Sequence, residues 1–180
     1  VFSLDHIASI IVILFLFIIF LRYNDKIGIK DDSKTFLIVL SILMIFLDLS
    51  EDLVRIFTGY YSITKDLPLQ LCSIGVYLAA FNLMYRNQTI FNLIFYWGFV
   101  GATNAILTPD GDLFELRIFF FYSQGYHAAL IFAVLWMMIK YDMRMDYRSI
   151  LQVVIYTNII VGLITIAVSY THLTLPTRIF

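Results

Sequence analysis

The chain has 180 residues, of which 61% are hydrophobic and 14% are charged. Soluble domains carry about 45–50% apolar and about 25% charged residues, so this composition excludes a soluble domain and indicates an integral membrane protein. The net charge of −1 provides no basic surface for nucleic acid, and the single cysteine excludes both an internal disulfide and a cysteine-rich metal site.

Long apolar runs separated by short polar segments predict helical spans, because the strands of a membrane barrel would alternate apolar and polar residues. A membrane-spanning helix needs about 20 mostly apolar residues. The segments that fit this pattern are residues 7–21, 36–57, 68–85, 90–107, 114–139 and 150–167. We therefore expect an all-α protein, a polytopic transmembrane bundle with six helices present, formed as a single domain over residues 1–167.

The end of the chain differs in character from the helix before it. Residues 168–177, VSYTHLTLPT, resemble the translation of a sequencing adaptor. We therefore expect residues 168–180 to be a non-native tail, and His172 takes no part in the functional argument. The alternative is a short polar C-terminus that belongs to the protein.

Lys and Arg are distributed unevenly between the two ends of the predicted helices, and these residues favour the cytoplasmic side of a membrane. One side carries Arg22, Lys26, Lys30, Lys34, Arg86, Lys140, Arg144 and Arg148. The opposite side carries only Arg55, Lys65 and Arg117. This distribution predicts that the N-terminus lies outside the cell.

Polar side chains gather in the predicted outer half of the bundle. They are His6, Asp48, Glu51, Gln70, Cys72, Asn104, Arg117 and His127. Ionisable groups inside a membrane are costly and usually face the bundle interior or a water-filled cavity. This convergence is the main indication of a functional site.

The sequence DLSEDLVR places Asp48, Glu51, Asp52 and Arg55 at i, i+3, i+4 and i+7, which is one face of a helix. Glu51 and Arg55 also have the spacing of an ion pair. Such a cluster either holds helices together near the membrane surface or contains an acid that orients a histidine. Glu51 is the candidate for that acid, because Asp48 and Arg55 share its face of the helix.

Cys72 lies close to the predicted start of the third helix, where the helix dipole favours a thiolate. A nucleophilic thiol also needs a base within hydrogen-bond reach, and His127 or His6 is the candidate. Structural roles remain open: a buried cysteine often acts as a small hydrophobic residue, His127 could be a hydrogen-bonded core residue, and His6 could sit at the membrane interface. No HxxxH or ExxH spacing occurs, so we expect neither a metal site nor a cofactor.

Small residues such as Gly98 and Gly101 lie along the fourth helix and allow a neighbouring helix to approach closely. Asn104 is then either a polar contact at that helix interface or part of a pocket wall. Arg117 opens the fifth helix before a run of aromatic residues, which either face lipid or line a pocket for acyl chains. The candidate substrate-binding residues are Gln70, Asn104, Asp48 and Arg117.

The motif LPLQLCSI at residues 67–74 and the segment HAALIFAVLWM at residues 127–137 resemble the YwaF-like bacterial integral membrane proteins. Shorter matches are LSE at residues 49–51, LTP at residues 107–109 and His6 at the start of the first helix. The resemblance covers residues 2–167. It implies seven transmembrane helices in the intact family and a location in the bacterial cytoplasmic membrane.

YwaF-like proteins are in turn similar to a eukaryotic family of transmembrane acyltransferases that act on ether phospholipids and in which a membrane cysteine is implicated. The resemblance implies that Cys72 is the acyl carrier and His127 its base. We add the hypotheses that Glu51 or His6 orients the histidine, and that Gln70 and Asn104 stabilise the oxyanion. The expected function is acyl transfer, with membrane lipids as partners.

Two other functions stay open on the sequence. A transporter or receptor-like bundle would bind a solute or move protons through Glu51, Asp52 and His127, and it would need an aqueous path to the cytoplasmic side. A purely structural subunit would respond to changes at Cys72 and His127 only in its stability. The sequence does not indicate an oligomeric state.

Overall fold

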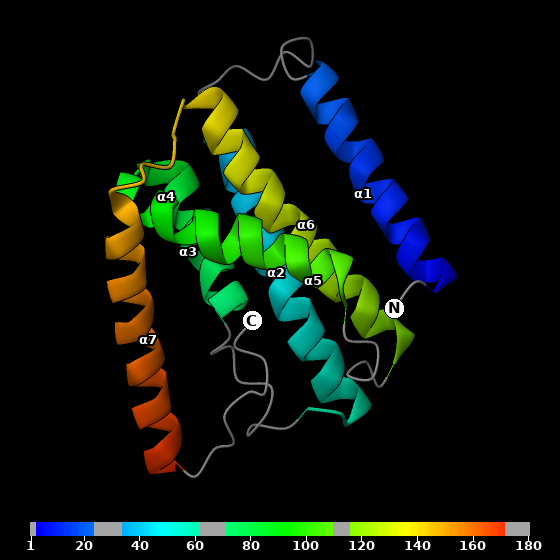
Figure 1. Cartoon of the computed structure of the whole chain (residues 1–180). Coiled ribbons are helices and arrows are strands. Elements are labelled where there is room, and N and C mark those ends of the chain that lie inside the picture. Colours follow the sequence, from blue (N-terminus) through cyan, green and yellow to red (C-terminus); the bar gives the residue numbers. More distant parts are fainter. Residues whose placement is uncertain (1–2, 24–33, 62–70, 110–115, 172–180) are drawn as a thin grey trace.

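The computed structural model describes residues 3–23, 34–61, 71–109 and 116–171 (Figure 1). The helices in these ranges are α1 (Leu4–Tyr23), α2 (Lys34–Thr58), α3 (Leu71–Tyr85), α4 (Gln88–Ile94), the π-helix η1 (Phe95–Gly101), α5 (Ala102–Leu107), α6 (Arg117–Lys140) and α7 (Ser149–Thr171). Because α4, η1 and α5 run on as one helix from residue 88 to residue 107, the described chain forms six helical spans. The predicted all-α bundle is confirmed.

The observed helix ends differ from the predicted ones by a few residues. α1 begins at Leu4 rather than at residue 7, and α7 continues to Thr171 rather than ending at residue 167. The described part of the third helix begins at Leu71, so the predicted start at Pro68 lies outside the described residues. The expectation that residues 168–180 are non-native stays a prediction.

Within the described ranges, four helices are long and apolar enough to cross a membrane. They are α1, the span Gln88–Leu107, α6 and residues Ser149–Ile166 of α7. α2 is longer, with 25 residues, but its second half carries three carboxylates. The described part of α3 has 15 residues, which span about 22 Å of a hydrocarbon layer about 30 Å thick. These two less typical helices pack on each other and on α6.

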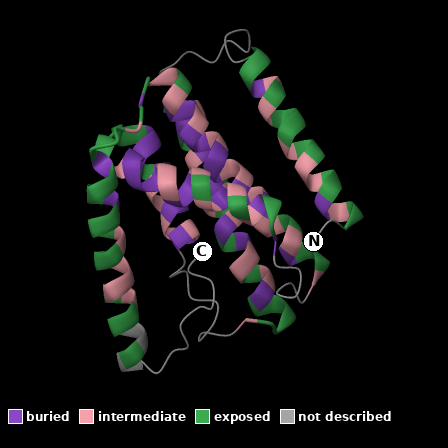
Figure 2. Cartoon of the chain, viewed as in Figure 1, coloured by how far each residue is buried: buried purple, intermediate pink, exposed green. Residues whose placement is uncertain are grey.

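α6 is the central helix of the bundle, and it contacts α1, α2, α3, α5 and η1. Its fully buried side chains include Leu130, Val134, Trp136 and Met137. Figure 2 shows buried residues concentrated where α3 and α6 meet their neighbours, whereas α1 and α7 are exposed along much of their length. A polar residue on α6 is therefore shielded by helices, and one on the outer face of α1 or α7 is not.

The span Gln88–Leu107 contains seven consecutive π-helical residues, Phe95–Gly101. Such π-helical turns are rare and often occur at functional sites. At Gly98 in this segment, a Cβ atom would lie 2.9 Å from Cγ of Leu130. α6 therefore crosses η1 too closely for a side chain at this position, and the contact holds Trp97 and Gly101 next to α3.

We expect Gly98→Ala to lower the free energy of unfolding by about 1–3 kcal/mol, because an added methyl group overpacks a filled interface. Gly125→Ala on α6 is the matched control, since a Cβ there meets no atom within 4 Å. Thermal unfolding in detergent micelles measures both variants. Equal melting temperatures for the two variants would contradict the prediction that no side chain fits between Gly98 and Leu130.

Candidate functional site

Cys72 lies in the first described turn of α3 and is partly buried. Its Sγ atom faces the junction of η1 and α5, since a Cβ atom at Gly101 would lie 4.0 Å from it. The glycine at position 101 leaves room for the sulfur between the two helices. The only thiol of the chain therefore sits at a contact between helices rather than on the lipid-facing surface of α3.

A cavity of about 370 Å³ opens beside Cys72, between α3, α7 and the span Gln88–Leu107. Most of its wall is apolar. Apart from two aromatic residues, the side chains with polar atoms in the wall are Cys72, Asn104, Thr157 and Asn158. Ligand pockets in proteins typically measure about 300–1,000 Å³ and combine apolar walls with a few polar groups, so the size and lining of this cavity suit a small or chain-like apolar ligand.

A buried polar cluster lies on the α2 side of Cys72. Asp48 of α2 is close enough to the thiol to interact with it electrostatically, and Ser73 and Tyr77 of α3 also approach this carboxylate. Oδ2 of Asp48 is buried and makes no hydrogen bond within the described ranges. A buried acceptor without a partner costs about 1–3 kcal/mol, so Asp48 offers a strong acceptor to a proton or to a donor group.

Tyr126 of α6 completes this cluster. It is buried and lies within electrostatic reach of Glu51, Cys72 and Asp48. Its ring centroid is 4.1 Å from that of His127. Tyr126 therefore lies between the region of the α2 carboxylates and the α3 thiol and the ring of His127 on its own helix.

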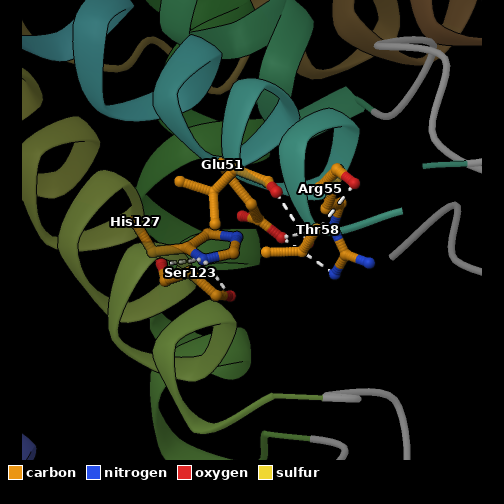
Figure 3. Close-up of polar contacts among 6 residues, drawn as sticks. Glu51, Arg55, Thr58, Ser123 and His127 are labelled. Carbon is orange, nitrogen blue, oxygen red and sulfur yellow. Dashed lines mark hydrogen bonds and ion pairs between the residues drawn. The ribbon is translucent and has the colours of Figure 1, made fainter. Parts of the chain in front are cut away.

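His127 is held in one tautomer by its own helix. Its Nδ1 atom lies 2.7 Å from the backbone oxygen of Ser123, and a carbonyl oxygen only accepts, so Nδ1 carries the hydrogen. In the neutral ring, Nε2 then has the lone pair. Figure 3 shows this ring in the same region as the Glu51 and Arg55 side chains of α2, which packs on α6. His127 is thus a buried imidazole whose Nε2 atom can act as a base.

Glu51 and Arg55 form the ion pair that their spacing predicts, which is confirmed. Oε1 of Glu51 accepts hydrogen bonds from Nη2 and Nε of Arg55 at 3.1 and 3.2 Å. The guanidinium carbon also lies 4.1 Å from the ring centroid of Phe119 on α6. The pair joins α2 to α6 beside His127, and the role of Glu51 as an orienting acid stays a prediction.

Two other predicted residues, His6 of α1 and Arg117 of α6, make contacts that join α1 to its neighbours. His6 is buried, and its Nε2 atom donates to the backbone oxygen of Ile106 at 2.8 Å. Arg117 pairs with Asp5, and its side chain is 73% exposed. His6 therefore satisfies a carbonyl at the end of α5, and Arg117 joins α6 to α1 at an exposed position.

Of the last two predicted residues, Asn104 and Gln70, only Asn104 lies in the described part of the chain. Asn104 lines the cavity near Cys72. Gln70 lies outside the described residues. Within the ranges that the structure describes, no group of three or more His, Cys, Asp or Glu side chains is placed to hold a metal ion.

The model of the TMEM164 family matches residues 1–174 of the chain. This chain belongs to the TMEM164 family. The match includes every helix that contributes to the cavity and to the polar cluster, and the family is one of transmembrane proteins. Together with the four apolar spans, membership of the TMEM164 family makes this a multi-pass membrane protein. No curated protein and no solved structure matches the chain.

In this TMEM164 family member, the sequence analysis missed three residues of the site. Tyr126 precedes His127 directly, yet nothing in the sequence shows that it reaches toward α2 and α3. Thr157 and Asn158 lie on α7, which we had treated as an apolar span. The sequence spacing could have revealed them, because Thr157 and Asn158 lie three and four residues after Val154 and so share its face of the helix with Ile150.

We expect Arg55→Met to lower the free energy of unfolding by about 3 kcal/mol, because it leaves the largely buried carboxylate of Glu51 without its cation. The double variant Arg55→Met/Glu51→Gln should recover most of this loss. Arg144→Met is the control, since Arg144 and Asp142 form an exposed pair that contributes about 0–1 kcal/mol. Thermal unfolding in micelles compares the three, and a double variant no more stable than Arg55→Met would disprove the pairing.

Proposed function

We propose that this protein is a membrane lipid acyltransferase that carries the acyl group on Cys72. The position of the thiol supports this most directly. Cys72 lines an apolar cavity, and the same residue lies within electrostatic reach of Asp48 and Tyr126. A lipid ester can approach from the apolar side, while the buried polar groups accept and return the thiol proton.

In the first step, Sγ of Cys72 attacks the carbonyl carbon of a phospholipid ester, and the thiol proton passes to Nε2 of His127. The bond between that carbonyl carbon and the glycerol oxygen then breaks. The glycerol oxygen takes the proton from His127 and leaves as the hydroxyl of a lysophospholipid, and the acyl group remains as a thioester. In the second step, the hydroxyl of another lipid attacks the thioester, and its proton returns through His127 to the sulfur.

The base in this mechanism is His127, since its Nδ1 hydrogen is engaged by Ser123 and its Nε2 atom carries the lone pair. Glu51 is the better candidate to orient it, because α2 packs on α6 and Figure 3 shows the Glu51 side chain in the same region as the His127 ring. His6 instead binds the backbone of Ile106. We therefore assign the orienting role to Glu51 and a structural role to His6.

The tetrahedral intermediate needs hydrogen-bond donors at its oxygen. Each such donor typically lowers the activation free energy of acyl transfer by about 3–4 kcal/mol. Asn104 brings a side-chain amide to the cavity wall that contains Cys72. Gln70, two residues before Cys72 in the sequence, is the candidate for a second donor. Asp48, with its unpaired Oδ2, contributes an acceptor close to the same thiol.

Membership of the TMEM164 family supports the membrane setting of this proposal. The acyl-transfer chemistry rests on the resemblance to YwaF-like proteins and, through them, to transmembrane acyltransferases of ether phospholipids. We place the protein in the bacterial cytoplasmic membrane with its N-terminus outside. In that orientation, Cys72 and the polar cluster lie in the outer half of the bilayer.

We expect the protein, reconstituted with isotopically labelled phospholipids, to form an acyl thioester on Cys72 that mass spectrometry detects. His127→Gln should reduce the rate of its formation by about 100-fold or more, since loss of a general base typically has an effect of that size. Cys72→Ala should abolish both the adduct and the transfer of label between lipids.

Arg144→Met serves as the control for folding and reconstitution, since Arg144 lies at an exposed turn remote in sequence from these residues. Continued transfer of label in Cys72→Ala would rule out the covalent mechanism. An unmodified Cys72 with unchanged lipids, in a protein that moves a solute or protons across vesicles, would instead favour the transporter alternative.

A further inference from the structure

The cavity beside Cys72 lies in a wedge between two helices. Figure 1 shows α7 and the span Gln88–Leu107 close together where both begin, and further apart toward their ends. α7 contacts α4 at the narrow end. Nearer the middle, Nε1 of Trp97 donates a hydrogen bond of 3.0 Å to Oγ1 of Thr157. The cavity between the two walls is therefore a groove that widens away from the contact of α7 with α4.

Each wall of this groove is one face of a helix. The α7 residues in the wall are Ile150, Val153, Val154, Thr157 and Asn158. The residues of the opposite span are Tyr96, Trp97, Val100, Gly101 and Asn104. The α7 stretch covers eight residue steps, which correspond to about 12 Å along an α-helix. The groove therefore extends over more than two turns of α7.

The polarity of the groove changes along its length. The amide groups of Asn104 and Asn158 lie at the end where the helices diverge, and Cys72 contacts the groove there beside Gly101. The other end has the aliphatic side chains of Ile150 and Val154. This arrangement complements a molecule with a polar group at one end and a hydrocarbon chain at the other.

The narrow end of the groove also faces the lipid. Ile150 and Val154 line the groove and are 45% and 49% exposed on the bundle surface. A hydrocarbon chain can therefore enter from the side, out of the bilayer, without crossing water. Val153, by contrast, is buried against Trp97 and Leu71 and forms the floor.

We propose that this groove binds one hydrocarbon chain of a membrane lipid, with the polar end of the chain at Cys72 and its tail along Ile150 and Val154. The identity of the group at Cys72, a lipid ester, rests on the proposed function, whereas chain binding does not. Val154 is then a specificity-determining residue, because its side chain contacts the tail of the bound chain.

The single cysteine makes a direct test possible, since every thiol-reactive probe reports on Cys72. The full chain in phosphatidylcholine nanodiscs is treated with N-ethylmaleimide or N-dodecylmaleimide, whose double bond adds the thiol sulfur at one carbon and the proton at the other. Mass spectrometry gives both rates. Val154→Trp should slow the dodecyl reagent by about tenfold or more, because it fills the tail end of the groove, and should leave the ethyl reagent unaffected.

Ile155→Trp is the matched control, because Ile155 is as exposed as Val154 but does not line the groove. It should leave both rates at the wild-type value. Equal dodecyl rates in the two tryptophan variants, or equal slowing of both reagents by Val154→Trp, would overturn the proposal.

The maleimide experiment tests chain binding independently of the experiment that tests acyl transfer. An acyl thioester on Cys72 combined with unchanged dodecyl rates in Val154→Trp would keep acyl transfer and overturn the groove. Chain-length-dependent slowing without any acyl thioester would keep the groove and remove acyl transfer.

Discussion

A polar side chain in hydrocarbon finds no water, so its hydrogen-bond partners must come from neighbouring helices. In this protein α6 meets that requirement, because it is surrounded by five other helical elements. Glu51, Tyr126 and His127 are buried or nearly so where α2, α3 and α6 meet. The close crossing at Gly98 brings η1 onto the same central helix. The arrangement of the site follows from the burial of these few polar groups.

Cys72 lies at the boundary between two environments. On one side is an apolar cavity open toward lipid, and on the other is the cluster that contains Asp48 and Tyr126. Reactions of lipid esters need both environments, since the chain requires apolar space and the reacting carbonyl requires proton donors and acceptors. This boundary position, rather than the presence of a thiol, is the reason that we propose a reaction at Cys72.

The predicted site residues separate into three groups in the structure. Asp48, Glu51 and Cys72 lie within electrostatic reach of Tyr126, whose ring packs on His127, and Asn104 lies with Cys72 in the cavity wall. His6 and Arg117 form separate contacts with Ile106 and Asp5. Depth in the membrane was predicted from position along each helix, but depth does not determine which way a side chain points around the bundle.

The sequence alone determined the membrane environment, the number of helices in the described residues and the Glu51–Arg55 pair, because these depend on hydropathy and on spacing within one helix. Only the tertiary structure decided that Tyr126 faces the carboxylates and that Thr157 and Asn158 share a groove with Cys72. Those relations depend on how helices rotate and cross. Rotation and crossing are set by close contacts such as Gly98 with Leu130, which join residues far apart in the chain.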